Sequence, residues 1–324
     1  MKSFEYAAPR KLTDALDLLG DRWGETEILA GGTDLVTSLK QQLTEPKRIV
    51  SLKNISELHG IQADGKVVRI GATTTLAELA ADKSVRQHFP ALVTAAEGIG
   101  STQMMNAGTV GGDLCQRPRC WYFRNGLGLV GKDAASAPAR NGENRYHAIF
   151  GNDGAAIFVS PSSLGPALIA LGAVMTVAGA KGKKREVPAS EFFQTPKNEN
   201  ERETALKPNE ILTEIKVPLN GLKNATYEVR HRHGLDWPYV TASVAFSVNG
   251  GSAADARVVL GHVAPTPWSA TGAGKAVNGA KVDASAASKA GEAAVAGAKP
   301  LSGNAYKVQL VKTAVKRALL AAAG

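Results

Sequence analysis

Apolar and polar residues in the first 55 positions follow two alternating periods. Short apolar runs of strand length are separated by segments in which apolar residues recur every three or four positions, as they do on one face of a helix. The predicted order is a strand at 4–6, a helix that ends near Gly20, a strand at 28–30, a helix over about 34–42 and a strand at 48–52. Strands that alternate with helices favour parallel pairing.

The pattern changes after residue 55. Predicted helices cover 90–99 and 162–171, and Leu76, Leu79 and Ala80 mark a shorter one. Predicted strands lie at 67–70, 156–160, 173–178 and 211–217. Between them, residues 115–155 show no regular period. A long irregular segment inside a compact domain is uncommon and is often functional.

Residues 224–324 form a third region. Alternating patterns predict strands at 225–230, 242–248 and 256–262. An Ala-rich stretch at 270–299 has helical propensity, and the last helix carries an apolar face made by Val308, Val311, Val315, Ala318 and Leu319. The chain therefore reads as a small αβ unit followed by two larger mixed units.

Composition and charge narrow the classes of protein to which this chain can belong. The 324 residues are 44% hydrophobic and 21% charged, as in ordinary globular proteins. No apolar run has the roughly 20 residues of a membrane span, and the first residues lack the apolar core of a secretory signal. We therefore expect a cytoplasmic protein, unless a partner exports it. The net charge of +9 raises the question of nucleic acid, but the charges are dispersed and no nucleic-acid module is present.

Two glycine-rich segments carry the strongest chemical signal. The first, 30–34, reads Ala-Gly-Gly-Thr-Asp between a strand and a helix, and the second, 106–113, reads Asn-Ala-Gly-Thr-Val-Gly-Gly-Asp. Exposed backbone N–H groups at such turns suit a pyrophosphate. Neither segment matches the G-x-G-x-x-G fingerprint, and the chain has no P-loop. Tight turns alone would also explain the glycines, so the residues by themselves leave both readings open.

Taken together, the two glycine segments resemble the paired FAD loops of the xanthine dehydrogenase family. More narrowly, the chain resembles the separate FAD-binding medium subunit of bacterial molybdenum hydroxylases of the carbon monoxide dehydrogenase and aldehyde oxidoreductase type. Three further segments resemble that subunit and spread the match along nearly the whole chain: 161–173, 206–218 and 263–268.

The resemblance implies an α+β architecture. It would comprise a two-subdomain FAD-binding fold of the vanillyl-alcohol-oxidase/PCMH type and a C-terminal α+β domain of the CO dehydrogenase flavoprotein type. The expected boundaries are 1–220 for the FAD-binding domain, with subdomains of about 1–55 and 56–220, and 224–324 for the C-terminal domain.

The resemblance also implies which residues bind FAD. The set is Leu29, Ala30, Gly31, Gly32, Thr33, Asp34, Leu35, Ser101, Ala107, Thr109, Gly111, Gly112, Asp113, Ser163 and Asp236. Two positions depart from the family, which usually has Asn at Asp113 and often has Asp at Ser163. A carboxylate beside a pyrophosphate would repel it, unless it points towards a ribitol or adenosine hydroxyl. No residue is assigned a catalytic role.

The only two cysteines, Cys115 and Cys120, follow the second glycine segment directly. This stretch resembles the branch of the family whose medium subunit carries a [4Fe-4S] cluster. Such a cluster needs four ligands, and even with His147 as a third this chain lacks the fourth. We therefore expect no cluster and no metal. A disulfide is the alternative, but two reduced, partly buried thiols fit a reducing compartment better. His231 and His233 read as surface histidines.

The resemblance implies an oxidoreductase subunit for electron transfer. A molybdopterin-binding large subunit would oxidise the substrate, and a small subunit would carry [2Fe-2S] clusters. The three chains would form a heterotrimer, with a dimer of heterotrimers as a further level. Electrons would leave FAD for an external acceptor such as NAD, oxygen or a quinone. The alternatives are an autonomous FAD-dependent oxidoreductase with its own small substrate and a basic nucleic-acid-binding module.

Overall fold

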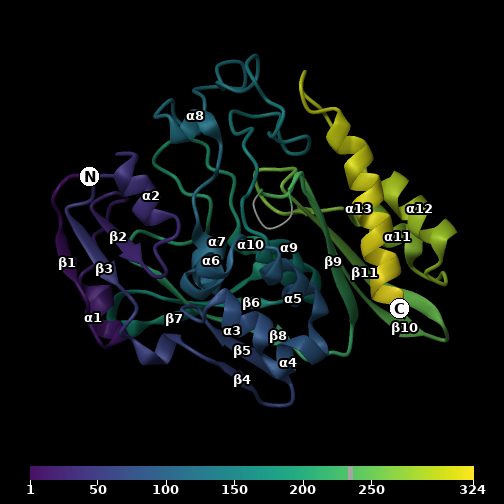
Figure 1. Cartoon of the computed structure of the whole chain (residues 1–324), viewed down its shortest axis with the longest axis horizontal. Helices are drawn as coiled ribbons and strands as arrows, with labels where there is room; N and C mark the ends of the chain where they lie inside the picture. Colours follow the sequence, from purple (N-terminus) through teal and green to yellow (C-terminus); the bar gives the residue numbers. More distant parts are fainter. Residues whose placement is uncertain (233–235) are drawn as a thin grey trace.

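A computed structural model describes residues 1–232 and 236–324, so His233 lies outside the described residues. Its first unit is a three-stranded sheet with two helices, at the left of Figure 1. Its elements are β1 (Glu5–Ala7), α1 (Leu12–Asp17), β2 (Thr26–Leu29), α2 (Leu35–Lys40) and β3 (Arg48–Ser51). β3 lies in the middle and pairs in parallel with both neighbours, which confirms the predicted pairing.

The second unit is built on a five-stranded antiparallel sheet in the order β4-β5-β8-β6-β7. The strands are β4 (Ile61–Ala63), β5 (Val67–Gly71), β6 (Val174–Ala178), β7 (Lys184–Pro188) and β8 (Ile211–Pro218). The helices are α3 (Leu76–Ala81), α4 (Lys83–His88), α5 (Pro90–Glu97), α6 (Thr102–Ala107), α7 (Val110–Cys115), α9 (Leu164–Leu171) and α10 (Ala189–Phe192). One hydrophobic core joins sheet and helices.

The third unit pairs a four-stranded antiparallel sheet with helices on one face (Figure 1). Its elements are β9 (Lys223–Val229), β10 (Val240–Asn249), β11 (Ser252–Gly261), β12 (Trp268–Ser269), α11 (Thr271–Val277), α12 (Ala284–Ala294) and α13 (Tyr306–Ala323). α13 packs on β9 and β10, burying the apolar stripe that the sequence predicts. α5 and α9 of the second unit pack against the opposite side of this sheet's strands, so the two units share a boundary.

The segment from 116 to 160 is almost entirely irregular, as expected, and contains the single turn α8 (Trp121–Arg124). The predicted strand at 156–160 is wrong. Its backbone bonds go to other loops, with Ala148 N–H donating to the Ile157 carbonyl and Ser160 N–H to the Ala264 carbonyl. The apolar side chains that imitate a strand pattern fill two small cores under the loop instead. Within the described ranges, no helix is long and apolar enough to cross a membrane.

Candidate functional site

The two glycine segments, about 75 residues apart in the chain, touch each other. The first is the turn between β2 and α2, and the second joins α6 to α7. A Cβ placed on Gly31 would lie only 1.8 Å from the carbonyl oxygen of Ala107. Gly32 has a φ of +75°, a conformation that glycine adopts without strain. Glycine is therefore required at this contact, where the two backbones meet.

A cleft runs along both segments and collects nine of the residues predicted from the sequence. They are Ala30, Gly31, Gly32, Thr33, Asp34, Leu35, Thr109, Gly111 and Gly112. Thr109 also caps the first turn of α7, since its hydroxyl accepts a hydrogen bond from Gly112 N–H at 3.0 Å. The cleft therefore brings together residues of both segments, as a pyrophosphate clasp requires.

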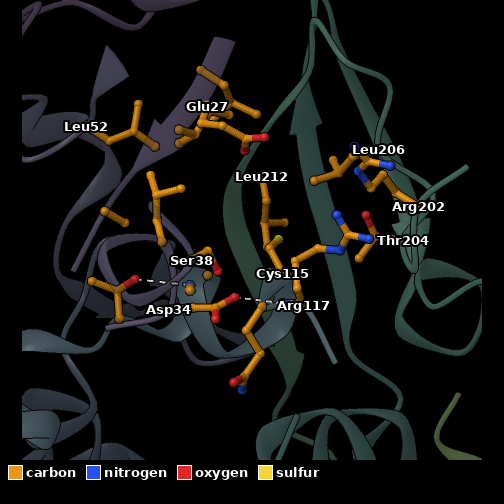
Figure 2. Close-up of a pocket in the computed structure, with 18 of the residues that line it drawn as sticks. Glu27, Asp34, Ser38, Leu52, Cys115, Arg117, Arg202, Thr204, Leu206 and Leu212 are labelled. Carbon is orange, nitrogen blue, oxygen red and sulfur yellow. Dashed lines mark hydrogen bonds between the residues drawn. The ribbon is translucent and has the colours of Figure 1, made fainter. Parts of the chain in front are cut away.

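Sequence reasoning missed the far walls of the cleft, which come from β2, β8 and the 202–206 segment. Figure 2 shows Glu27, Arg202, Leu206 and Leu212 there. Burial raises the pKa of Glu27, although the charge of Arg202 opposes that shift. The Arg202 guanidinium lies 5.1 Å from the centre of the Trp23 ring, where a cation–π contact forms. Leu206 and Leu212 lie in the 206–218 segment that resembles the family, and Glu27 lies just before the first glycine segment, but neither pattern assigned a side chain to the cleft. Arg202 lies in no recognised segment, so no local signal could have found it.

Asp34 is the electrostatic centre of the cleft's lower edge. One carboxylate oxygen accepts from Arg117 N–H at 2.8 Å, and the other contacts the guanidinium groups of Arg119 at 3.0 Å and Arg124 at 2.8 Å (Figure 2 shows part of this network). Arg124 also donates to the Ser38 hydroxyl at 2.9 Å. The first glycine segment is thereby bound to the segment after Cys115.

Asp113 lies at the end of the second segment, and its carboxylate faces away from the cleft. It accepts hydrogen bonds from the Ser162 hydroxyl at 2.6 Å, from Leu164 N–H at 3.0 Å and from the Gln116 side chain at 3.0 Å. Burial raises the pKa of Asp113, and these hydrogen bonds oppose the shift. The carboxylate thus binds the start of α9, a direction that the sequence analysis did not consider.

Five other predicted residues lie outside the lining of the cleft as well. Ser163 is 1% exposed, and its hydroxyl has no hydrogen-bond partner among the described residues. Ser101 caps α6 by accepting from Met104 N–H, and Ala107 forms the contact with Gly31. The remaining two are Leu29, at the end of β2, and Asp236, which is found in a second cavity. Their predicted contacts with a cofactor stay predictions.

The second cavity, of about 320 Å³, opens between the irregular segment and the third unit. Its walls are aromatic and imidazole rings, lined by Trp121, Tyr146, His147, Trp237, Tyr239 and His262, with Cys120 and Asp236 at their side. Cys120 Sγ lies 3.2 Å from His147 Nε2. The second cavity shares no lining residue with the cleft. The ion pair between Asp34, which lines the cleft, and Arg119, which lines the second cavity, connects the walls of the two spaces.

Both cysteines are free thiols and are partly buried. Burial raises the pKa of the Cys115 thiol to about 12 and also raises that of Cys120. In the described part of the chain, no group of three or more His, Cys, Asp or Glu side chains could hold a metal ion. Cys120 instead packs against a small apolar cluster of Leu129, Ala156 and Phe158.

Two protein-family models match nearly the whole chain. Residues 2–220 match the model of the FAD binding domain in molybdopterin dehydrogenase, and residues 225–322 match the CO dehydrogenase flavoprotein C-terminal domain.

Individual proteins agree with the family models. The carbon monoxide dehydrogenase medium chain of Hydrogenophaga pseudoflava is 30% identical over 98% of this chain and 96% of its own length. The aldehyde oxidoreductase FAD-binding subunit PaoB of Escherichia coli is 30% identical over 83% of this chain and 84% of its own. A solved structure of the Hydrogenophaga pseudoflava carbon monoxide dehydrogenase, which lacks the Mo-pyranopterin moiety of its molybdenum cofactor, superimposes with a TM-score of 0.77 and 28% identity. That match covers 99% of this chain and 97% of the other.

Proposed function

This chain belongs to the FAD-binding medium subunits of the xanthine dehydrogenase and molybdenum hydroxylase family, and we propose that it holds FAD in the cleft between the two glycine segments. It is an oxidoreductase subunit for electron transfer. The single observation that carries the site is the direct contact of Gly31 with Ala107 at the edge of a cleft lined by both segments.

The residues present fit the cofactor. The backbone N–H groups of residues 30–34 would hold the pyrophosphate, which glycine lets approach closely, and Thr109, Gly111 and Gly112 would complete the pocket. The carboxylate that could have repelled it, on Asp113, points at α9 instead. The unpartnered Ser163 hydroxyl would find its partner on the ribityl chain, as the sequence predicts. Bound FAD supplies a group that accepts electrons and releases them singly or in pairs.

The partners follow from the family. We propose a heterotrimer with a molybdopterin-binding large subunit and a [2Fe-2S] small subunit, and a dimer of such heterotrimers as the complete assembly. The acceptor of the electrons would be NAD, oxygen or a quinone. The relatives support this reading because they are named as subunits of larger enzymes.

The boundaries 1–220 and 224–324 for the two domains belong to the same proposal, and the family matches to 2–220 and 225–322 support them. The cytoplasmic location expected from the sequence stays a prediction.

Purification of the tagged chain from its own host tests the function. We expect about one FAD per chain, and we expect a molybdopterin subunit and a [2Fe-2S] subunit to copurify with it. Purification without partners, together with flavin reduction by a small substrate added to the isolated chain, would instead support the autonomous oxidoreductase. A colourless chain that binds nucleic acid would contradict both.

A further inference from the structure

The end of the cleft that lies beyond the glycine segments is mostly apolar. Leucine and isoleucine side chains make much of its surface: Leu43, Leu52, Leu206, Ile211 and Leu212. Two charged side chains, Glu27 and Arg202, stand on opposite walls of this space, as Figure 2 shows. Ligand pockets have this composition, with an apolar lining and a few polar groups that fix the orientation of the ligand.

Glu27 has acceptor capacity that the protein leaves unused. Its carboxylate accepts one hydrogen bond, from the Thr44 hydroxyl at 3.3 Å, and it forms no ion pair with any residue that the structure describes. A carboxylate has about four lone-pair positions for hydrogen bonds. Burial raises the pKa of Glu27, so the carboxyl stands in poorly solvated surroundings. A ligand group that donates hydrogen bonds would relieve that cost.

Arg202 is fixed in place by contacts that leave its charge uncompensated. One of its terminal nitrogens, Nη1, donates to the backbone carbonyls of Glu199 and Glu201, each at 3.2 Å. Its guanidinium also lies 5.1 Å from the centre of the Trp23 ring. In the described ranges, no carboxylate forms an ion pair with this guanidinium. A guanidinium held in this way offers a flat, positively charged surface on which a nucleobase can stack.

The position of Glu27 along β2 matches the reach of a nucleobase. Glu27 lies three residues before Ala30, which is about 10 Å along the strand from the expected pyrophosphate contact. The ribose is bonded directly to the phosphate and would lie short of this distance, whereas the outer edge of the base would reach it. The ribityl and flavin half of the cofactor is expected at Ser163 and Asp236, outside the lining of the cleft. The adenosine half therefore remains for this end of the cleft.

We propose that Glu27 selects the base of the dinucleotide: its carboxylate accepts a hydrogen bond from the amino group of adenine, while the base stacks on Arg202. Hypoxanthine and guanine carry a carbonyl oxygen where adenine carries this amino group. Two acceptors that face each other repel, so the carboxylate favours FAD over a dinucleotide with either of those bases. The proposal deepens the proposed function and rests on it.

Three flavins test the proposal on the full chain after its FAD has been removed. They are FAD, its deaminated analogue flavin hypoxanthine dinucleotide, and FMN, which has no adenosine. The change in flavin fluorescence gives each Kd at about pH 8, which favours the ionised carboxyl. We expect FAD to bind about tenfold more tightly than the deaminated analogue, and FMN to bind more weakly than both. Equal affinities for FAD and the analogue would overturn the proposal and leave the proposed function intact.

Variants of the two charged residues separate their roles. In Glu27→Gln the amide can turn either its oxygen or its NH₂ group toward the base, so the preference for FAD over the analogue should fall to about twofold or less. Arg202→Met should weaken both dinucleotides about tenfold and keep the preference, because stacking does not distinguish the two bases. Glu186→Gln, at a 60% exposed position on β7, is the matched control and should bind all three flavins like the original chain.

The affinity for FMN shows whether the effects arise at the base. FMN does not reach Glu27, so its Kd should stay unchanged in every variant, and a parallel loss of FMN binding would overturn the proposal. Full preference for FAD in a folded Glu27→Gln chain would overturn it too. If that variant does not fold, Glu27→Leu makes the same test, because it places an apolar side chain in an apolar wall. A chain that binds none of the three flavins contradicts the proposed function and this proposal with it.

Discussion

The carboxylate of Asp113 accepts a hydrogen bond from the Ser162 hydroxyl, with the two oxygen atoms 2.6 Å apart. This bond connects the end of the second glycine segment to the start of α9. This contact directs the carboxylate to the start of α9, which gives a structural reason for an acid at this position. The sequence raised two possible directions for this side chain, toward the phosphates or toward a ribitol or adenosine hydroxyl, and the folded chain shows a third, toward α9.

Asp113→Ala should therefore weaken the fold more than it weakens cofactor binding. It leaves Leu164 N–H and the Ser162 hydroxyl unpaired in the interior, and we expect a loss of about 2–4 kcal/mol in the free energy of unfolding. Asp113→Asn should change FAD affinity by at most about threefold. Urea unfolding and FAD titration measure the two effects. The exposed helix cap Asp283→Ala is the matched control, with an expected loss of about 1 kcal/mol. A clear rise in FAD affinity in the Asn variant would show that Asp113 faces the phosphates.

Gly31→Ala should separate the two glycine segments. The added Cβ would lie 1.8 Å from the Ala107 carbonyl oxygen, so one backbone has to move. We expect FAD affinity to fall at least about tenfold and stability to fall by about 1–3 kcal/mol. Gly154→Ala, where an added Cβ meets nothing within 4 Å, should match the original chain in both assays. Normal FAD binding by Gly31→Ala would contradict the contact between the segments.

The Asp34–Arg124 pair should be energetically coupled. The two side chains are only 17% and 11% exposed and their charged atoms are 2.8 Å apart. A double-mutant cycle with alanine at both positions should give a coupling of about 1–3 kcal/mol in unfolding experiments. The exposed pair Lys299–Asp153, at 63% and 70%, should give less than about 0.5 kcal/mol in the same cycle. Equal couplings would mean that Asp34 does not anchor the arginine segment.

Stability should fall as the pH drops from about 6.5 toward 4. Burial lowers the pKa of His147 to about 4 and that of His262 to about 3, with the charge of Lys307 acting in the same direction. The unfolded chain therefore takes up protons more readily in this window, and each histidine should remove roughly 2–3 kcal/mol by pH 4.5. Urea unfolding across the range should show a flatter profile for His147→Gln or His262→Gln.

The purified chain, separated from its partners, should contain no iron–sulfur cluster. Only Cys120 of the two cysteines lies near His147, and the space beside it is filled by Leu129, Ala156 and Phe158. Iron and sulfide analysis should find well below one iron per chain, because a [4Fe-4S] cluster needs four ligands. About four irons per chain would overturn this expectation.

The parts of the site that sequence could predict are those in which the backbone itself is the functional group. Gly31 and Gly111 indicate a close approach between two backbone segments, because a side chain at either position would clash. Their neighbours Thr33 and Thr109 could be assigned to the site for the same reason. The parallel pairing of the strands in the first unit was predictable too, since strands that alternate with helices favour it. The side chain of Arg202, which enters from a distant segment, left no local pattern.

In the irregular segment at 116–160, the sequence pattern predicted a strand that the structure does not contain. Ile157 and Phe158 looked like a strand because an apolar pair bounded by turns reads the same in a sheet and in a small loop core. The imidazole of His262 follows β11 with nothing beside it in sequence to indicate a cavity. Its surroundings come from Trp237, from the irregular segment and from α13, which only the fold brings together.

The core of the first unit is not made by the first unit alone. Leu12, Leu16 and Val50 pack against Ala178 at the end of β6 and Ile211 at the start of β8, some 130 to 200 positions later. The opening 55 residues are thus not a detachable module, since cutting them away would expose an apolar face on both pieces. Exchange of residues 1–55 between relatives would succeed only if Ala178 and Ile211, which complete its core, were exchanged with it.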